Sequence, residues 1–295
     1  MQCISHVMRQ NKVVNILKDK IISIQDAVNI VNNGDMIAFG GNVLHRAPMA
    51  FARELVRQGK NKLKIVKTAG AHEVDLLCAA GCVESVDAGF ISYESEFGLA
   101  NNYRKAVESG KIKGNEHACY TVISALRAAA YGVPFMPVRG LMYGDLINEN
   151  DYFKRVEDPF GGDPVTLVKA LVPDIGVIHV QECDARGNAR IYGPRFDDKL
   201  ISRASKKLII TTEQIVPESK LKSNPDMVDI PHFLVEAVVH VPKGAAPCSC
   251  DKKYDIDRKV LSSFKNIKSM EDIKSYLNIY EAKDRKPVTK GGSIW

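Results

Sequence analysis

Two carboxylates in the stretch 92–98 (SYESEFG) directly follow an apolar strand predicted at 88–93. Open α/β sheets bind ligands outside the carboxyl ends of their strands, which is where Glu94 and Glu96 would lie. If the strand continued, its alternation would point both acids to one side, and their mutual repulsion would raise one pKa, as a general acid or base requires. Glu96 is the better candidate. A solvated loop before the helix predicted at 102–108 would also favour acids, so the pattern alone fixes no mechanism.

A glycine pair, Gly40 and Gly41, lies between an apolar strand at 36–39 and a helix predicted at 48–59. Backbone N–H groups in such a loop can face an anion, assisted by the helix dipole. Asn42 completes the candidate substrate or oxyanion loop. A plain tight turn would have the same sequence, so both interpretations stand.

His45 and Arg46 lie just beyond the glycine pair, where a cation can hold a phosphate or a carboxylate. A solvated pair of loop residues is the simpler alternative. The loop has no G-x-G-x-x-G fingerprint, and the chain has no Walker lysine motif, so nicotinamide cofactors and nucleoside triphosphates have little support.

Cys119 directly precedes a helix predicted at 121–131, where a thiolate could be stabilised, although a nucleophilic Cys-His pair is the weaker interpretation. Seven scattered cysteines are an odd number and too few for a disulfide framework, so reduced thiols and a cytoplasmic location are expected. Two close pairs lack matching zinc ligands, so core-filling thiols and no metal site are predicted: Cys78 with Cys82, and Cys248 with Cys250.

The composition describes a globular chain of 295 residues, 45% hydrophobic and 26% charged, which excludes disorder, collagen and coiled coil as descriptions of the whole. No stretch approaches the ~18 apolar residues of a membrane span, and the first residues lack an apolar signal region. The net charge of +6 comes mostly from residues 251–295, with 11 Lys/Arg against 7 Asp/Glu. These lysines lack interleaved aromatics, so neither nucleic-acid nor membrane binding is expected.

The elements that must position these residues alternate between short apolar strands and amphipathic helices. This rhythm predicts an α/β fold with an open, mainly parallel twisted sheet flanked by helices. A turn signal at 184–188 predicts one short antiparallel hairpin. We expect an N-terminal extension at 1–22, the α/β domain at 23–250, and a Lys-rich helical C-terminal appendage and tail at 251–295.

Several segments, in order between about residues 23 and 256, resemble the A (alpha) subunits of the family I CoA-transferases. They are Gly40-Gly41, 129–138 (AAYGVPFMPV), 174–181 (DIGVIHVQ), 187–193 (GNARIYG), 213–215 (EQI), 229–231 (DIP) and 242–255. The resemblance implies the open α/β fold and a partner B subunit. It also implies transfer of CoA from an acyl-CoA to a carboxylic acid, with no metal and no dissociable cofactor, coenzyme A itself being substrate or covalent intermediate.

In that family the thioester is attacked by a glutamate of the B subunit, which becomes a glutamyl-CoA thioester. Its motif is Ser-Glu-Asn-Gly, which 95–98 (SEFG) resembles only superficially, because this stretch follows the third strand whereas the family motif follows an earlier one. The nucleophile is therefore not assigned to Glu96. Two departures stand out: Cys119 replaces the family's oxyanion-stabilising Gln, and Asn42 replaces the Phe of a Gly-Gly-Phe loop.

A thiol is a weaker donor than an amide, so these departures leave two alternatives open. One is a CoA-thioester-dependent carbon-carbon bond hydrolase of the same fold, in which Glu96 would activate water. The other is a non-catalytic chain that forms half a pocket. In each case we expect Glu96 to face the acyl pocket at the subunit interface. The identities of acyl donor and acceptor and the oligomer stoichiometry do not follow from the sequence.

Overall fold

The computed structural model describes residues 19–141, 144–149 and 151–286. Its strands are β1 (Met36–Phe39), β2 (Leu63–Gly70), β3 (Val83–Ile91), β4 (Lys113–Glu116), β5 (Phe135–Val138), β6 (Phe153–Val156), β7 (Val165–Lys169), β8 (Ile175–Cys183), β9 (Ala189–Arg190), β10 (Lys207–Ile215) and β11 (Ala237–His240). Its α-helices are α2 (Ile24–Asn29), α3 (Met49–Arg57), α4 (His72–Ala79), α5 (Glu94–Phe97), α6 (Asn101–Glu108), α7 (Cys119–Ala130), α8 (Leu146–Glu149), α9 (Asp198–Ala204), α10 (Glu218–Lys222), α11 (Arg258–Phe264) and α12 (Met270–Asp284). Two 3₁₀ turns lie at Pro225–Met227 and His232–Leu234.

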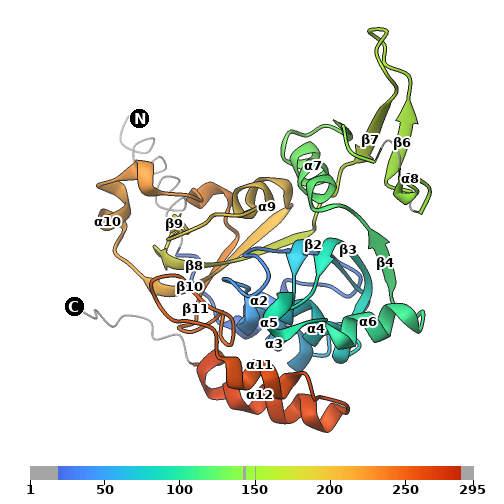
Figure 1. The fold of residues 1–295 in the computed structure, drawn as a ribbon. Coiled ribbons are helices and arrows are strands. Elements are labelled where there is room, and N and C mark those ends of the chain that lie inside the picture. Colours follow the sequence, from blue (N-terminus) through green and yellow to red (C-terminus); the bar gives the residue numbers. More distant parts are fainter. Residues whose placement is uncertain (1–18, 142–143, 150, 287–295) are drawn as a thin grey trace, which may run out of the picture.

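The main sheet has the order β11-β10-β8-β1-β2-β3-β4, and every neighbouring pair in it is parallel (Figure 1). The central strand β8 is buried at all nine positions, as expected for a parallel strand covered on both faces. The short strand β9 pairs antiparallel with β8 after the predicted turn. The predicted α/β fold and its hairpin are therefore confirmed.

Alternate residues of the strands pack into two separate cores. Ile37 and Phe39 of β1 join the apolar sides of α2, α3, α4 and α6, whereas Ala38 between them packs on the opposite face with α7 and α9. This alternation follows from the two-residue repeat of an extended chain. The helices therefore cover both faces of the sheet and leave its strand ends free to build a site.

A second, three-stranded antiparallel sheet with the order β5-β7-β6 projects from the body beside α7 (Figure 1). The sequence predicts its first strand but not the other two. Pro137 occupies the edge strand β5, where a missing N–H costs little.

The C-terminal appendage packs against α3 and α4 through a third apolar core (Figure 1). A buried ion pair secures it: both oxygens of Asp284 in α12 lie 2.7 Å from the guanidinium of Arg53, which is itself fully buried in α3. Arg285 reaches back to Glu54 at 2.9 Å. No helix in the described part of the chain is long and apolar enough to cross a membrane.

Replacing Asp284 should detach the appendage. Asp284→Ala leaves the buried Arg53 without a counter-ion, so we expect the free energy of unfolding to fall by about 3–5 kcal/mol in urea denaturation. The control is Glu108→Ala, which removes the partner of Arg104 in an ion pair on the surface. Both of these side chains are 58% exposed, so the free energy of unfolding should fall by less than about 0.5 kcal/mol. Equal losses in the two variants would contradict this view of the appendage.

His72 should make stability depend on pH. Burial, helped by the charge of Arg53, lowers the pKa of His72 to about 3, so the folded chain keeps this imidazole neutral. Between pH 6.5 and 3 the unfolded chain therefore binds a proton that the folded chain does not, and stability falls as pH falls. His72→Gln should reduce the loss between about pH 6.5 and pH 4.5 by about 2 kcal/mol, measured by urea denaturation across pH. The same pH profile in both proteins would show that His72 does not carry the effect.

Candidate functional site

The loop after β1 is fixed by hydrogen bonds at the carboxyl edge of the sheet. The N–H of Gly40 donates to Val177 O at 2.8 Å, and the N–H of Asn42 donates to His45 O at 2.8 Å. The N–H of Gly41 donates to Asp198 Oδ1 at 2.9 Å. All three N–H groups of the predicted oxyanion loop are thus bound within the chain in this conformation.

Asp198, at the start of α9, joins this loop to Arg46. Its Oδ2 lies 2.6 Å from Arg46 Nη2, and both side chains are buried, at 0% and 2% exposure. Arg46 also donates to the carbonyl oxygens of His179 and Pro194. Its guanidinium therefore binds groups of the protein rather than lying in a solvated loop.

Lys67 of β2 binds the same loop from the interior of the protein. Its buried ammonium donates to the carbonyl oxygens of Phe39 at 3.2 Å, Gly40 at 2.6 Å and Gly41 at 3.0 Å. The carboxylate of Glu73 lies 3.4 Å away and balances the charge. This buried cation therefore holds the glycine pair in one conformation.

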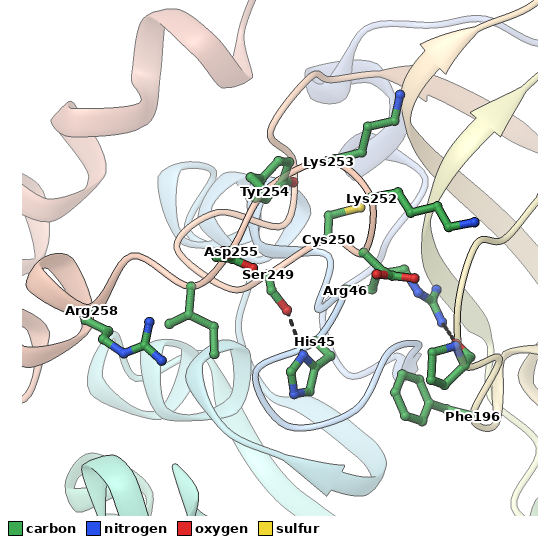
Figure 2. A pocket seen from close by; sticks show the side chains of 13 residues that line it. His45, Arg46, Phe196, Ser249, Cys250, Lys252, Lys253, Tyr254, Asp255 and Arg258 are labelled. Atoms are coloured by element: carbon green, nitrogen blue, oxygen red, sulfur yellow. Dashed lines mark hydrogen bonds between the residues drawn. The ribbon is translucent and has the colours of Figure 1, made fainter.

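A cavity of about 900 Å³ opens beside this loop. Its walls come from three parts of the chain (Figure 2): His45 and Arg46, Pro194 and Phe196, and the segment 249–256 with Arg258. His45 Nδ1 lies 2.7 Å from Ser249 Oγ, which joins the first wall to the third. Segments distant in the sequence therefore form one hollow.

The lining of the cavity carries more positive than negative side chains. Lys252 and Lys253 extend from the same segment as Asp251 and Asp255, and His45 and the paired Arg46 lie beside Ser249 of that segment (Figure 2). Phe196 adds an aromatic surface 5.6 Å from the Arg46 guanidinium carbon. The cavity is chemically suited to an anion with an apolar part.

Glu96 lies outside the lining of the cavity but contacts its rim. Residues Glu94–Phe97 form the short helix α5, because β3 ends at Ile91. The strand-like alternation that would place Glu94 and Glu96 on one side is therefore wrong. Glu96 Oε1 lies 2.5 Å from Nε of Arg258, which lines the cavity, and the Glu96 side chain is 50% exposed. A catalytic role for Glu96 stays a prediction.

Cys119 is exposed at the first turn of α7, close to the carboxyl ends of β2 and β3. Its thiol contacts the carbonyl oxygen of Thr68 at 3.5 Å, and a Cβ on Gly89 would lie 2.2 Å from the Cys119 nitrogen. Burial raises the pKa of Cys119, and the nearby Asp197 raises it further. The thiol form is therefore favoured, which argues against an activated thiolate.

Three charged residues of this edge escaped sequence reasoning: Lys67, Asp197 and Asp198. Burial raises the pKa of Asp197, although the Thr68 hydroxyl and Lys67 oppose that rise. The sequence does not distinguish Lys67 from Lys64 of the same strand, and the two aspartates look like ordinary N-terminal helix residues.

Comparison with known proteins identifies the family. The model of the family described as Coenzyme A transferase matches residues 21–241. The chain belongs to the coenzyme A transferase family. Among its relatives is the A subunit of glutaconate CoA-transferase from Acidaminococcus fermentans, 30% identical over 90% of this chain and 89% of that protein. The resemblance seen in the sequence is thereby confirmed.

Other relatives of the chain carry different names. An IpdA subunit of a cholesterol ring-cleaving hydrolase from Rhodococcus jostii is 32% identical over 82% of this chain and 84% of that one. An uncharacterized protein of Archaeoglobus fulgidus is 37% identical over 90% of this chain. The present chain spans only 60% of the length of that archaeal protein.

Two solved structures agree with the fold. The crystal structure of glutaconate coenzyme A-transferase from A. fermentans has a TM-score of 0.84, with 29% identity over 90% of this chain and 94% of that chain. A cysteine-to-serine variant of the decarboxylase AibA/AibB has a TM-score of 0.79, with 30% identity over 88% of this chain and 98% of that chain.

The glycine loop should tolerate no side chain at Gly41. Gly41 has φ +72°, and a Cβ there would lie 2.4 Å from His45 O, whereas Gly34 has φ +87° with nothing within 4 Å. In Gly34→Ala only the left-handed backbone conformation is unfavourable, so the free energy of unfolding should fall by about 1–2 kcal/mol. Gly41→Ala should cost a further 1–3 kcal/mol or so from overpacking. Urea denaturation measures both losses of unfolding free energy. Equal losses would show that the loop can move to accommodate a side chain at Gly41.

Proposed function

We propose that this chain is the A subunit of a two-subunit CoA-transferase that moves CoA between carboxylic acids. The observation that carries the proposal is the near end-to-end match to the A subunit of glutaconate CoA-transferase, in sequence and in fold.

The described cysteines are free thiols, which fits the cytoplasm as the compartment. We keep 1–22, 23–250 and 251–295 as the proposed divisions. The described end of the first of them already joins the sheet, because Ile21 bridges to Val238.

In the proposed reaction the nucleophilic glutamate belongs to the B subunit. It attacks the acyl-CoA thioester and expels the CoA thiolate, which leaves a mixed anhydride. The thiolate then attacks the glutamyl carbonyl of this anhydride, releases the donor acid as its carboxylate and forms the glutamyl-CoA thioester. The acceptor carboxylate takes up the CoA by the same two steps in reverse, which frees the glutamate. The mixed anhydride between these steps must be kept from water, which an interface between two subunits can exclude. The cavity beside Arg46 would supply one wall of that interface.

The lining supports an anionic substrate. Lys252 and Lys253 place positive charge around the cavity, and Phe196 gives it an apolar side. Coenzyme A phosphates and free carboxylates both suit such a lining, since charge-assisted hydrogen bonds to them are strong. The acyl group itself is not specified by these residues.

The alternative is a CoA-thioester-dependent carbon-carbon bond hydrolase. Two observations support this alternative. The IpdA subunit is 32% identical to this chain, and Cys119 stands where the resemblance to the transferases implies an amide donor. In this alternative Glu96 would activate water. A third alternative, a chain that only forms half of a pocket, predicts that no substitution here affects turnover directly.

Exchange assays separate these functions. The isolated chain should show no CoA transfer between an acyl-CoA and a labelled carboxylate, because it lacks the nucleophile, and turnover should appear once the B subunit is added. Cys119→Gln installs an amide donor and should raise the exchange rate, by up to about 10²-fold. Exchange by the purified chain alone would overturn the proposal.

A glutamate pair provides the discriminating control in the same assay. Glu96→Gln should leave exchange within about twofold if the partner supplies the nucleophile, because the change only weakens an exposed ion pair. Loss of thioester-dependent hydrolysis in Glu96→Gln, with Glu94→Gln unaffected, would instead establish the hydrolase. If no substitution in this chain changes exchange or hydrolysis, the chain only forms half of a pocket.

A further inference from the structure

Three side chains with metal-ligating atoms meet behind the wall of the cavity. His179 comes from β8, Glu213 from β10, and Cys250 from the segment that follows β11. One imidazole nitrogen, one carboxylate oxygen and the sulfur all lie within 4.8 Å of one another. We propose that these three residues form a zinc-binding site, which is independent of the transferase proposal.

The chemistry of the donors selects the metal. Thiolate, imidazole and carboxylate together are typical of zinc, whereas magnesium and calcium take oxygen ligands. His179 and Cys250 are fully buried, and the Glu213 side chain is 7% exposed. Three protein ligands leave a fourth position for water, which can enter from the cavity because Cys250 and Tyr254 line its wall.

The groups behind the ligands are already arranged as a metal site requires. A ligating histidine normally bonds its second nitrogen to another group, and His179 Nδ1 lies 2.9 Å from Thr211 Oγ1. Glu213 Oε2 accepts the N–H of Lys243 at 2.8 Å. His179 Nε2 and Glu213 Oε1 are bonded to each other at 2.8 Å, and Tyr254 also donates to this Oε1. A cation held by these two atoms and the sulfur would take the place of the bond between them.

Zinc would replace the hydrogen bond between His179 and Glu213. In the metal-free chain Nε2 carries the N–H that donates to the Glu213 carboxylate. On zinc binding the single N–H would move to Nδ1 and donate to Thr211, so that Nε2 offers a lone pair. Cys250 would release its thiol proton to solvent. The two anionic ligands then balance the charge of Zn²⁺, and Tyr254, whose hydroxyl donates to Glu213 Oε1 at 2.5 Å, supports the carboxylate.

Such a site would pin the cavity wall. Segment 249–256 already contacts β8, because the side-chain amide of Gln181 donates to Asp251 O at 3.2 Å. Zinc would join this segment to both β8 and β10 through Cys250. We therefore expect metal binding to stabilise the wall rather than to perform the transfer chemistry. Sequence reasoning predicts no metal here, because the ligands are separated by 34 and 37 positions and share no motif.

The test uses the full chain, reduced, stripped with chelator and titrated with Zn²⁺ or Co²⁺ alone. We expect one equivalent of Co²⁺ to bind and give a thiolate-to-cobalt charge-transfer band, which Zn²⁺ abolishes by displacement. Zn²⁺ should also raise the midpoint of thermal unfolding. No partner chain and no CoA are needed, so the result does not depend on the transferase proposal.

A matched pair of cysteine variants assigns the ligand. Cys250→Ser should lose the charge-transfer band, whereas Cys248→Ser, which changes an equally buried thiol outside the cluster, should keep it. Thr211→Val should weaken Zn²⁺ binding by about 10–100-fold. Absence of the band in the wild-type protein overturns the proposal even where a variant fails to fold. A band that survives in a folded Cys250→Ser overturns it too.

Discussion

The carboxylate of Asp198 is the interaction on which the candidate site depends. One oxygen binds the N–H of Gly41 and the other binds Arg46, and neither charged group has water as an alternative partner. Removing one member of such a buried pair leaves the other unpaired at a cost of several kcal/mol. The same contact explains a glycine, because a Cβ on Gly40 would lie 2.3 Å from Asp198 Oδ1. The loop after β1 and the first turn of α9 therefore behave as one unit.

A second buried charge pair holds the opposite wall. Arg53 binds Asp284 of the appendage and also donates to the carbonyl oxygen of Ala246, just before the segment that lines the cavity. The first helix of the appendage, α11, begins with Arg258 at the rim of the cavity. What the sequence presents as a Lys-rich tail is thus, at least to residue 286, a structural support for the site. Its described buried positions are apolar or paired, as Ile273 and Asp284 show.

Most of the main sheet could be predicted from the sequence because its strands are short apolar runs punctuated by turn residues. The helix predicted at 121–131 is observed at Cys119–Ala130. The small sheet could not be predicted, since only Phe153 of β6 is buried and a strand with one inward residue has no period to detect. The helical turn at Glu94–Phe97 could not be predicted for a related reason, because two acids separated by one residue look the same at the end of a strand and in a single helical turn. Asp198 gave no signal because its partners, Gly41 and Arg46, lie 157 and 152 positions away.

The same physics bears on what this chain contributes to catalysis. Oxyanion stabilisation requires donors that are free to point at the developing charge. Here the N–H groups of Gly40, Gly41 and Asn42 are all bound within the chain, and Cys119 offers a weak thiol donor with a raised pKa. Relatives on this fold carry the names of transferases, a hydrolase and a decarboxylase, so the fold does not choose among these chemistries. Under the proposed function, the charge-stabilising groups would therefore come mainly from the B subunit, together with the nucleophile, and this chain would contribute the rigid wall of the cavity.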